Sequence, residues 1–327
     1  MKAFNIMVVR MAAAAALIAV AGAAAAQQAY PNKPIRMTTP YAPGGSTTIL
    51  ARMVAQKLTE SWGQQVIVEN RPGGNTVIGT ESLAKSAPDG YTIMLTSNIH
   101  VINPNLFPNL PYDPVRDFAP IGTVSRIEFV LVVHPSVPAN TLQEFIALAK
   151  SSPGKLNYAT SGSGGAGHLA TEMFSVMTGV KMQHIPYKGG GAALIDLIGG
   201  QVDLGFAVPL EFTPHIKSGK LRALAISGEA RLPSLPDVPT FTEAGLPGLD
   251  IAFWQGILAP AGTPKAIIDK LSAELARILA MPDIREKLVF QGVQPYINTP
   301  EQFASLIKAD LAKFAKLIKT ANIRLEN

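Results

Sequence analysis

Segments of strand length alternate with segments of helical periodicity along most of the chain, and this alternation limits the folds open to it. Runs rich in β-branched and aliphatic residues predict strands at 35–39, 66–68, 91–96, 130–133, 156–160, 183–186, 202–206 and 222–227. Strands that alternate with helices predict α/β sheets covered by helices on both faces.

Apolar residues at helical spacing predict the helices that join these strands. The clearest case is a helix whose apolar face would contain Ile49, Leu50, Met53, Val54 and Leu58. Further helices are predicted near 77–85, from Thr141 to about Ser151, after Pro264, and toward the end of the chain. Thr141 and Glu144 have the spacing of a capping box, which marks the start of the second of these.

The length and the cysteine content restrict the class of protein further. A chain of 327 residues suits two domains, and an apolar content of 47% is enough to form their cores. The absence of cysteine excludes disulfides, thiolate nucleophiles, cysteine-bound zinc and iron–sulfur clusters. It also excludes the acylated cysteine of a bacterial lipoprotein anchor.

The first 26 residues have the pattern of a secretory signal peptide. Lys2 and Arg10 precede a small, apolar run from Met11 to Ala26 that ends in Ala24-Ala25-Ala26. A membrane anchor is the alternative, but this run is shorter than the ~20 residues of a spanning helix. Cleavage near Ala26 and export are therefore predicted. The net charge of +5 includes no basic run, so no nucleic-acid partner is expected.

Three glycine-rich turns form the strongest candidate for a ligand site. They cover 42–47, 161–167 and 187–191, and each follows a predicted strand and precedes a predicted helix. The first N–H groups of a helix have no intrahelical partner, and the helix dipole adds positive charge there. This chemistry suits a carboxylate or another small anion. A tight turn also needs glycine without any ligand, so a purely structural role remains the alternative for each turn.

Known catalytic and nucleotide-binding motifs are missing. There is no P-loop, no GxGxxG within a convincing βαβ unit, and no HExxH or HxH pair for a metal. Ser161 and Ser163 do not lie in a GxSxG elbow. His168 could donate to a ligand or fasten its loop, and both roles stay open. Trp254 could line a cleft, although a large aromatic side chain is more often in the core.

Ordered short segments across nearly the whole mature chain resemble the tripartite tricarboxylate transporter substrate-binding proteins, also called Bug receptors. The matching segments are 30–36, 43–46 (Pro-Gly-Gly-Ser), 70–73 (Asn-Arg-Pro-Gly), 87–92 (Ala-Pro-Asp-Gly-Tyr-Thr), 103–104, 112–118, 184–189 (His-Ile-Pro-Tyr-Lys-Gly), 200–203, 235–240 and 260–264. Each segment alone is weak, whereas their order and spacing together are specific to the family.

The resemblance implies a two-lobed periplasmic binding protein of type II topology. Each lobe would hold a central mixed sheet flanked by helices, and a hinge would link the lobes. The expected boundaries are residues 1–26 for the signal peptide, 27–125 plus 252–327 for the first lobe, and 126–251 for the second. The family implies a monomer that needs no cofactor, holds no metal, performs no catalysis, and delivers a small organic carboxylate to a membrane permease.

The resemblance also assigns contacts to the ligand, largely through backbone amides, hydroxyls and water. In the first lobe these residues are Tyr41, Pro43, Gly44, Gly45, Ser46, Thr48 and Asn98. In the second lobe they are Ser161, Gly162, Ser163, Gly165, Ala166, His168, Tyr187 and Ala207.

Two of these positions depart from the usual family pattern. Thr48 and Ala207 stand where an aspartate is common, and the second loop has Ala166-Gly167 where a hydroxyl is frequent. These losses of polarity lead to the hypothesis of an aromatic or longer aliphatic carboxylate, rather than an amino acid or citrate.

Two other functions use the same residues. A periplasmic hydrolase could use Ser163 with His168, although the nucleophile elbow is missing. A sensor that presents its closed form to a histidine kinase would have the same fold, and the sequence does not separate it from a transport receptor.

Overall fold

The computed structural model describes residues 30–43, 46–160, 162–187, 190–249, 253–290 and 293–320. The predicted signal peptide and the candidate ligand residues Gly44, Gly45 and Ser161 lie outside the described residues.

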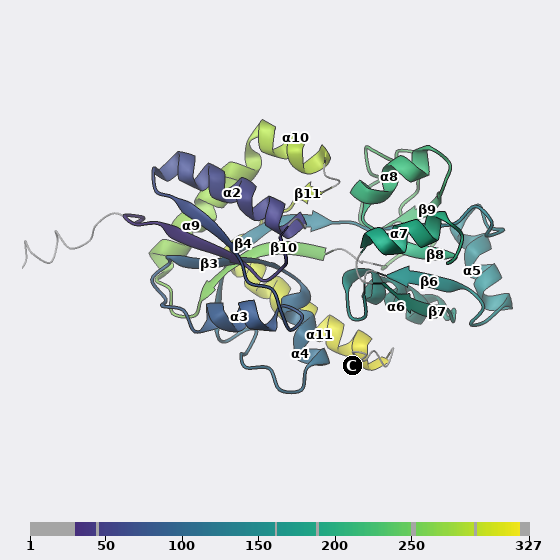
Figure 1. Ribbon diagram of the computed structural model, residues 1–327, viewed down its shortest axis with the longest axis horizontal. Helices are drawn as coiled ribbons and strands as arrows, with labels where there is room; N and C mark the ends of the chain where they lie inside the picture. The colour runs from purple at the N-terminus through teal and green to yellow at the C-terminus, as the bar shows by residue number, and fades with distance from the viewer. Residues whose placement is uncertain are drawn as a thin grey trace, which may run out of the picture.

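The described residues form two lobes, each built on its own mixed sheet (Figure 1). The sheet of the first lobe has the strand order β11-β4-β10-β3-β1-β2. Its strands are β1 (Ile35–Thr39), β2 (Val66–Asn70), β3 (Thr92–Ser97), β4 (Phe118–Ile127), β10 (Phe253–Pro260) and β11 (Gln294–Pro295). β1, β2 and β3 are parallel, while β10 runs antiparallel to both β3 and β4.

Helices cover both faces of this sheet. The helices are α2 (Ser46–Trp62), α3 (Val77–Ala84), α4 (Ile99–Leu106), α9 (Lys265–Ala280), α10 (Pro282–Phe290) and α11 (Pro300–Thr320). Figure 1 shows α2, α9 and α10 above the sheet and α3, α4 and α11 below it. The buried side chains of α2, α9 and α10 belong to one cluster, and those of α3, α4 and α11 belong to another, which continues into the second lobe.

The sheet of the second lobe has the strand order β7-β6-β8-β5-β9. Its strands are β5 (Val130–Val133), β6 (Asn157–Thr160), β7 (Gln183–Pro186), β8 (Leu204–Ala207) and β9 (Arg222–Ile226). The helices that flank it are α5 (Leu142–Ser151), α6 (Ala166–Thr178), α7 (Gly190–Ile198) and α8 (Pro209–Lys217). Two mixed sheets flanked by helices confirm the predicted α/β class.

The helical periodicity predicted α2 correctly, but one residue assigned to its buried face is exposed. In α2, Leu50, Val54 and Leu58 are buried against the sheet, as predicted. Ile49 is not on that face, since 44% of it is exposed. Its position one residue before Leu50 turns it by about 100° toward solvent.

The start of α5 contains only half of the predicted capping box. Thr141 Oγ1 accepts the N–H of Glu144 at 3.2 Å, as expected for an N-cap. The carboxylate of Glu144 accepts the N–H of Asn140 at 2.6 Å and does not return to Thr141.

Two long antiparallel strands, β4 and β10, were not predicted. All eight residues of β10 are buried, and Trp254 lies in the core with its Nε1 donating to Asp310 at 2.8 Å. The core alternative for Trp254 is therefore the right one. Gly256 lies so close to Phe303 that an added Cβ would be 2.4 Å from the ring. Because β10 contains glycine and polar residues, it lacks the continuous apolar pattern by which a buried strand is predicted.

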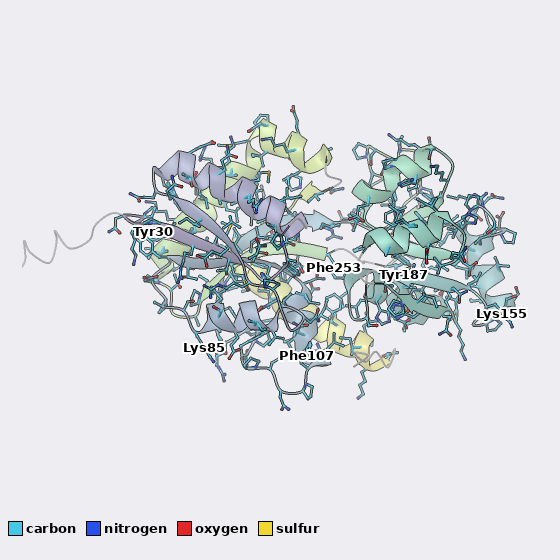
Figure 2. All side chains as sticks on the ribbon, viewed as in Figure 1. Tyr30, Lys85, Phe107, Lys155, Tyr187 and Phe253 are labelled. Carbon is cyan, nitrogen blue, oxygen red and sulfur yellow. The ribbon has the colours of Figure 1, made fainter. Side chains whose placement is uncertain are left out.

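The two lobes share buried apolar contacts near their junction. Phe129, in the connection between β4 and β5, packs edge-on against Phe253 with ring centroids 5.3 Å apart. Phe314 of α11 lies 6.3 Å from Phe253, also between ring centroids. Figure 2 places Phe253 where the lobes meet. β4 ends at Ile127, β5 begins at Val130 and β10 begins at Phe253. The lobe boundaries expected from the sequence stay a prediction.

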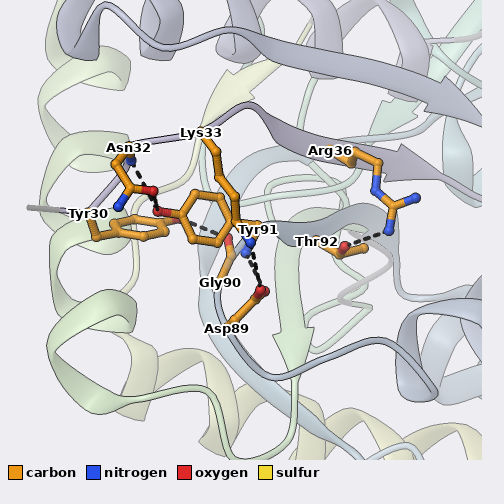
Figure 3. Close-up of polar contacts among 8 residues, drawn as sticks. All are labelled: Tyr30, Asn32, Lys33, Arg36, Asp89, Gly90, Tyr91 and Thr92. Carbon is orange, nitrogen blue, oxygen red and sulfur yellow. Dashed lines mark hydrogen bonds and ion pairs between the residues drawn. The ribbon is translucent and has the colours of Figure 1, made fainter. Parts of the chain in front are cut away.

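The first described residues are fastened to the end of the first lobe that lies away from the second, where Figure 2 labels Tyr30, and Figure 3 shows their contacts. The Tyr30 hydroxyl donates to the carbonyl of Gly90, and the Tyr91 hydroxyl donates to Asn32 Oδ1, both at 2.8 Å. Lys33 pairs with Asp89 at 3.2 Å and lies 4.2 Å from the Tyr91 ring centre. We call these contacts the N-terminal clamp. Among the described residues, no helix is long and apolar enough to cross a bilayer.

Candidate functional site

The three glycine-rich turns lie between strand ends and helix starts, as predicted. β1 ends at Thr39 before α2 begins at Ser46, and β6 ends at Thr160 before α6 begins at Ala166. β7 ends at Pro186 before α7 begins at Gly190. Each turn therefore presents the first N–H groups of a helix beyond the carboxyl end of a strand, which is where open α/β sheets bind ligands.

The second lobe contains a pocket of about 300 Å³ at the ends of β6 and β8. We call it the second-lobe pocket, and its lining is Phe129, Ala159, Thr160, Ala166, Gly167, Gly190, Ala193, Leu197, Gly205, Phe206, Ala207, Val208, Glu211 and Phe212. The first turns of α6, α7 and α8 all contribute to it. Small residues and aromatic rings form most of the wall, so the pocket is largely apolar with helix starts at its edge.

Gly167 brings α6 close to β8 at the pocket wall. A Cβ on Gly167 would lie 3.1 Å from the Phe206 carbonyl oxygen, so only glycine allows this approach without a shift. The N-cap of α6, Gly165, has no side chain to satisfy the first N–H groups. The start of α6 thus keeps N–H groups available to an anion.

His168 holds the glycine-rich loop that precedes α6. Its Nδ1 accepts the N–H of Gly164 at 3.0 Å, and Gly164 has a φ of +73° that favours glycine. The ring is buried and stacks on His184 at a centroid distance of 4.0 Å. Of the two roles left open for His168, the structure thus shows the loop-fastening one. Ser163 makes no hydrogen bond with His168 among the described residues, so the dyad of the hydrolase hypothesis is not formed.

The neutral state of His168 leads to a prediction on stability. Burial, together with the smaller effect of the neighbouring His184, lowers the pKa of His168 to about 4. The unfolded chain takes up this proton at a higher pH than the folded protein does. The free energy of unfolding should therefore fall as the pH drops from about 6.5 toward 4, by up to ~1.4 kcal/mol per pH unit.

The matched variant for this prediction is His168→Asn, because asparagine keeps an acceptor for Gly164 and does not titrate. Urea unfolding between pH 7 and 4.5 should show a shallower loss of stability in the variant than in the wild type. An equal loss of stability with falling pH in the two proteins would show that protonation of His168 is not its cause.

The first-lobe candidates are held by a separate network. Asn70 Nδ2 donates to the Tyr41 carbonyl and to Thr48 Oγ1, both at 2.8 Å. The Tyr41 hydroxyl is 2.6 Å from Ser97 Oγ, and burial raises the pKa of Tyr41. Thr48 is 1% exposed. Asn70 therefore positions the first glycine-rich turn, although the sequence analysis assigned it no role.

Asn98 has an unusual environment in the first lobe. It is fully buried at the start of α4, and neither atom of its side-chain amide has a hydrogen-bond partner among the described residues. A buried polar group without a partner is costly, so such a group is a candidate for contact with a ligand or water.

The predicted site residues do not all meet in one place. Ala166 and Ala207 line the second-lobe pocket, whereas Tyr41, Pro43, Thr48 and Asn98 belong to the first lobe and do not line it. Gly162, Ser163, Gly165, His168 and Tyr187 lie near the pocket but are not part of its lining. The Tyr187 hydroxyl donates instead to Asp196 at 2.7 Å.

Several pocket residues were not predicted from the sequence, among them Phe129, Phe212 and Glu211. Phe129 lies in the connection between the lobes, and Phe212 and Glu211 lie in α8. Glu211 is the one charged side chain among the described residues of the lining. No motif marks these positions, because the chain brings them to the pocket from distant segments.

Two mixed α/β sheets, with helix starts around a pocket at the strand ends, define the fold of a periplasmic solute-binding protein. The family model of the tripartite tricarboxylate transporter family receptor (TctC) matches residues 50–323. The chain belongs to this family, whose members are substrate-binding receptors and not enzymes.

Named relatives support the same assignment. Protein BugT of Bordetella pertussis is 39% identical over 317 residues, which cover 94% of this chain and 96% of BugT. A structure of an R. palustris protein with adipate is 34% identical, has a TM-score of 0.79, and covers 91% of this chain and 100% of its own. MatC from Rhodopseudomonas palustris with bound malate is 30% identical, with a TM-score of 0.75 and coverages of 88% and 100%.

Proposed function

We propose that this protein captures a small organic carboxylate between its two lobes and delivers it to a permease of the tripartite tricarboxylate type. One observation supports the proposal most directly. The N–H groups at the start of α6 open into an apolar pocket, in a chain whose structural relatives hold adipate and malate. The ligand carboxylate would accept from these N–H groups.

The proposed site also includes the glycine-rich loop of the first lobe. The lobes would close by hinge bending near 125–130 and 249–253, which would bring Tyr41, Thr48 and Asn98 toward the ligand. Gly44, Gly45, Ser46 and Pro43 would contribute from the same loop, and Ser161, Gly162, Ser163 and Gly165 from the loop of the second lobe. The open amide atoms of Asn98 support this part of the proposal.

The body of the ligand would be apolar. Phe129, Phe206 and Phe212 surround the pocket, and Ala207 lines it where the family often has aspartate. Burial of apolar surface stabilises the complex by roughly 25 cal/mol per Å². An aromatic or longer aliphatic carboxylate would therefore bind better than citrate.

Ala207→Asp is expected to weaken binding of the best carboxylate by tenfold or more. Ala207 is 3% exposed, so the new carboxylate would be buried in an apolar wall and would repel the ligand. Thr48→Asp should act in the same direction. Isothermal titration calorimetry checks both, and Ala192→Asp on the exposed side of α7 is the control. A gain in affinity in either site variant would contradict an apolar-bodied ligand.

A thermal-shift panel of mono-, di- and tricarboxylates tests the proposed function as a whole. A ligand at one hundred times its Kd adds about 2.7 kcal/mol of stability, which raises the Tm by several degrees. A selective shift by one class of carboxylate is the expected result. A flat response of folded, ligand-free protein across the panel would overturn the proposal.

Export and the permease require their own tests. The signal-peptide pattern supports export with cleavage near Ala26, which N-terminal sequencing of the mature protein would check. Co-purification of the ligand-bound mature monomer with a membrane permease would support delivery. Co-purification with a histidine kinase would favour the sensor function instead.

A further inference from the structure

A carboxylate of the protein itself, that of Glu211, lies beside the start of α7 at the second-lobe pocket. Glu211 lines the pocket from the first turn of α8. A Cβ on Gly190, the first residue of α7, would lie only 3.0 Å from Glu211 Oε2. Glu211 therefore places negative charge against the start of α7, where the helix dipole favours it.

The start of α6, on the other side of the same pocket, has no such internal anion. No acidic residue lies in its first turn, and its N-cap Gly165 has no side chain. The two helix starts at the pocket therefore differ in whether an acidic side chain of the protein lies beside them. One has the carboxylate of Glu211 beside it, and the other keeps its N–H groups open to a ligand.

Among the described residues that line the pocket, Glu211 is the one charged side chain. Among the described residues, its carboxylate has no hydrogen-bond donor and no cation as a partner. The Glu211 residue is exposed. A second negative group that entered the pocket beside it would be repelled.

We propose that Glu211 stands in for the second carboxylate of a diacid and makes this protein selective for monocarboxylates. This inference rests on the proposed function, because it assumes that the start of α6 takes the ligand carboxylate. The distal end of the ligand would be neutral or would donate a hydrogen bond to Glu211. The selectivity would differ from that of the relatives solved with adipate and malate, both of which are diacids.

The test uses two sets of matched probes with isothermal titration calorimetry on the mature chain. The aliphatic set is hexanoate, 6-aminohexanoate and adipate. The aromatic set is benzoate, 4-aminobenzoate and terephthalate. In at least one set, the wild type should bind the monocarboxylates at least tenfold more tightly than the diacid, a difference of about 1.4 kcal/mol.

The variants are Glu211→Gln and Glu211→Ala, with Glu144→Gln as the matched control. Glu144 is also in the first turn of a helix, but α5 lies away from the pocket. Removal of the Glu211 charge should raise the affinity for the diacid at least tenfold and change that for the unsubstituted monocarboxylate less than threefold. The control should keep the wild-type preference. A melting curve for each variant verifies that it is folded.

The outcomes separate the inference from the proposed function. If the wild type binds the diacid as tightly as the monocarboxylate, or if both Glu211 variants keep the wild-type preference, Glu211 is not the selectivity residue and the carboxylate receptor stands. If the folded wild type binds none of the six probes, both proposals are overturned.

Discussion

Gly167→Val should lower the affinity for the carboxylate ligand by at least a hundredfold. Gly167 lies in the first turn of α6 and lines the second-lobe pocket. Its added Cβ would lie 3.1 Å from the carbonyl oxygen of Phe206, which is backbone and cannot swing away. The helix start would shift off β8, and the branched side chain would fill part of the pocket. Misplaced N–H groups would no longer converge on the carboxylate.

The same change should lower the free energy of unfolding by about 1–3 kcal/mol, as overpacking usually does. Calorimetry with the best carboxylate and urea unfolding would measure the two effects. Gly191→Ala is the control, because a Cβ on Gly191 meets nothing within 4 Å. It should bind normally and be unchanged or slightly more stable. Normal binding by Gly167→Val would mean that the start of α6 does not hold the ligand.

Arg126→Met should destabilise the protein by about 3 kcal/mol. Arg126 Nε donates to Glu128 Oε1 at 2.7 Å, and Glu128 is 3% exposed. Ser227 Oγ donates to the other oxygen of Glu128 and accepts the N–H of Phe129. Loss of the arginine would leave a buried carboxylate without its cation, which costs several kcal/mol.

Urea unfolding of three variants would isolate this pair. The double variant Arg126→Met/Glu128→Gln should recover part of the loss, because no buried charge remains. Arg231→Met is the matched control, since its pair with Glu243 is about half exposed and should contribute less than about 1 kcal/mol. Equal losses at Arg126 and Arg231 would show that burial of Glu128 is not the cause. Because this pair lies where the chain crosses between the lobes, ligand affinity should change as well.

The sequence predicted the parts of the fold that depend on local patterns. β1, β5 and β7 were placed at their observed bounds, because each is a short run limited by turn residues. β4 and β10 were missed, because Gly122 and Gly256 interrupt their apolar pattern and their burial comes from pairing across long sequence distances. Local propensity contains no signal for such pairing.

The candidate site also has a part that local sequence patterns predict and a part that they do not. The glycine-rich turns could be predicted, since a strand, a turn and a helix follow one another in the chain. Glu211 and Phe129 could not, because only the folded chain brings α8 and the interlobe connection to the start of α6. Ala207 was proposed as a site residue because the family often has aspartate at this position. The structure places Ala207 in the pocket wall.

The N-terminal clamp has a practical consequence for the use of this protein as a detector. The clamp ties the chain start to the end of the first lobe that points away from the second (Figures 1 and 3). A surface linkage placed before Tyr30 would immobilise the first lobe and leave the second lobe free to swing. A fluorophore on the exposed Ile195 of α7 would then report closure optically, so the receptor could serve as a reagentless carboxylate biosensor.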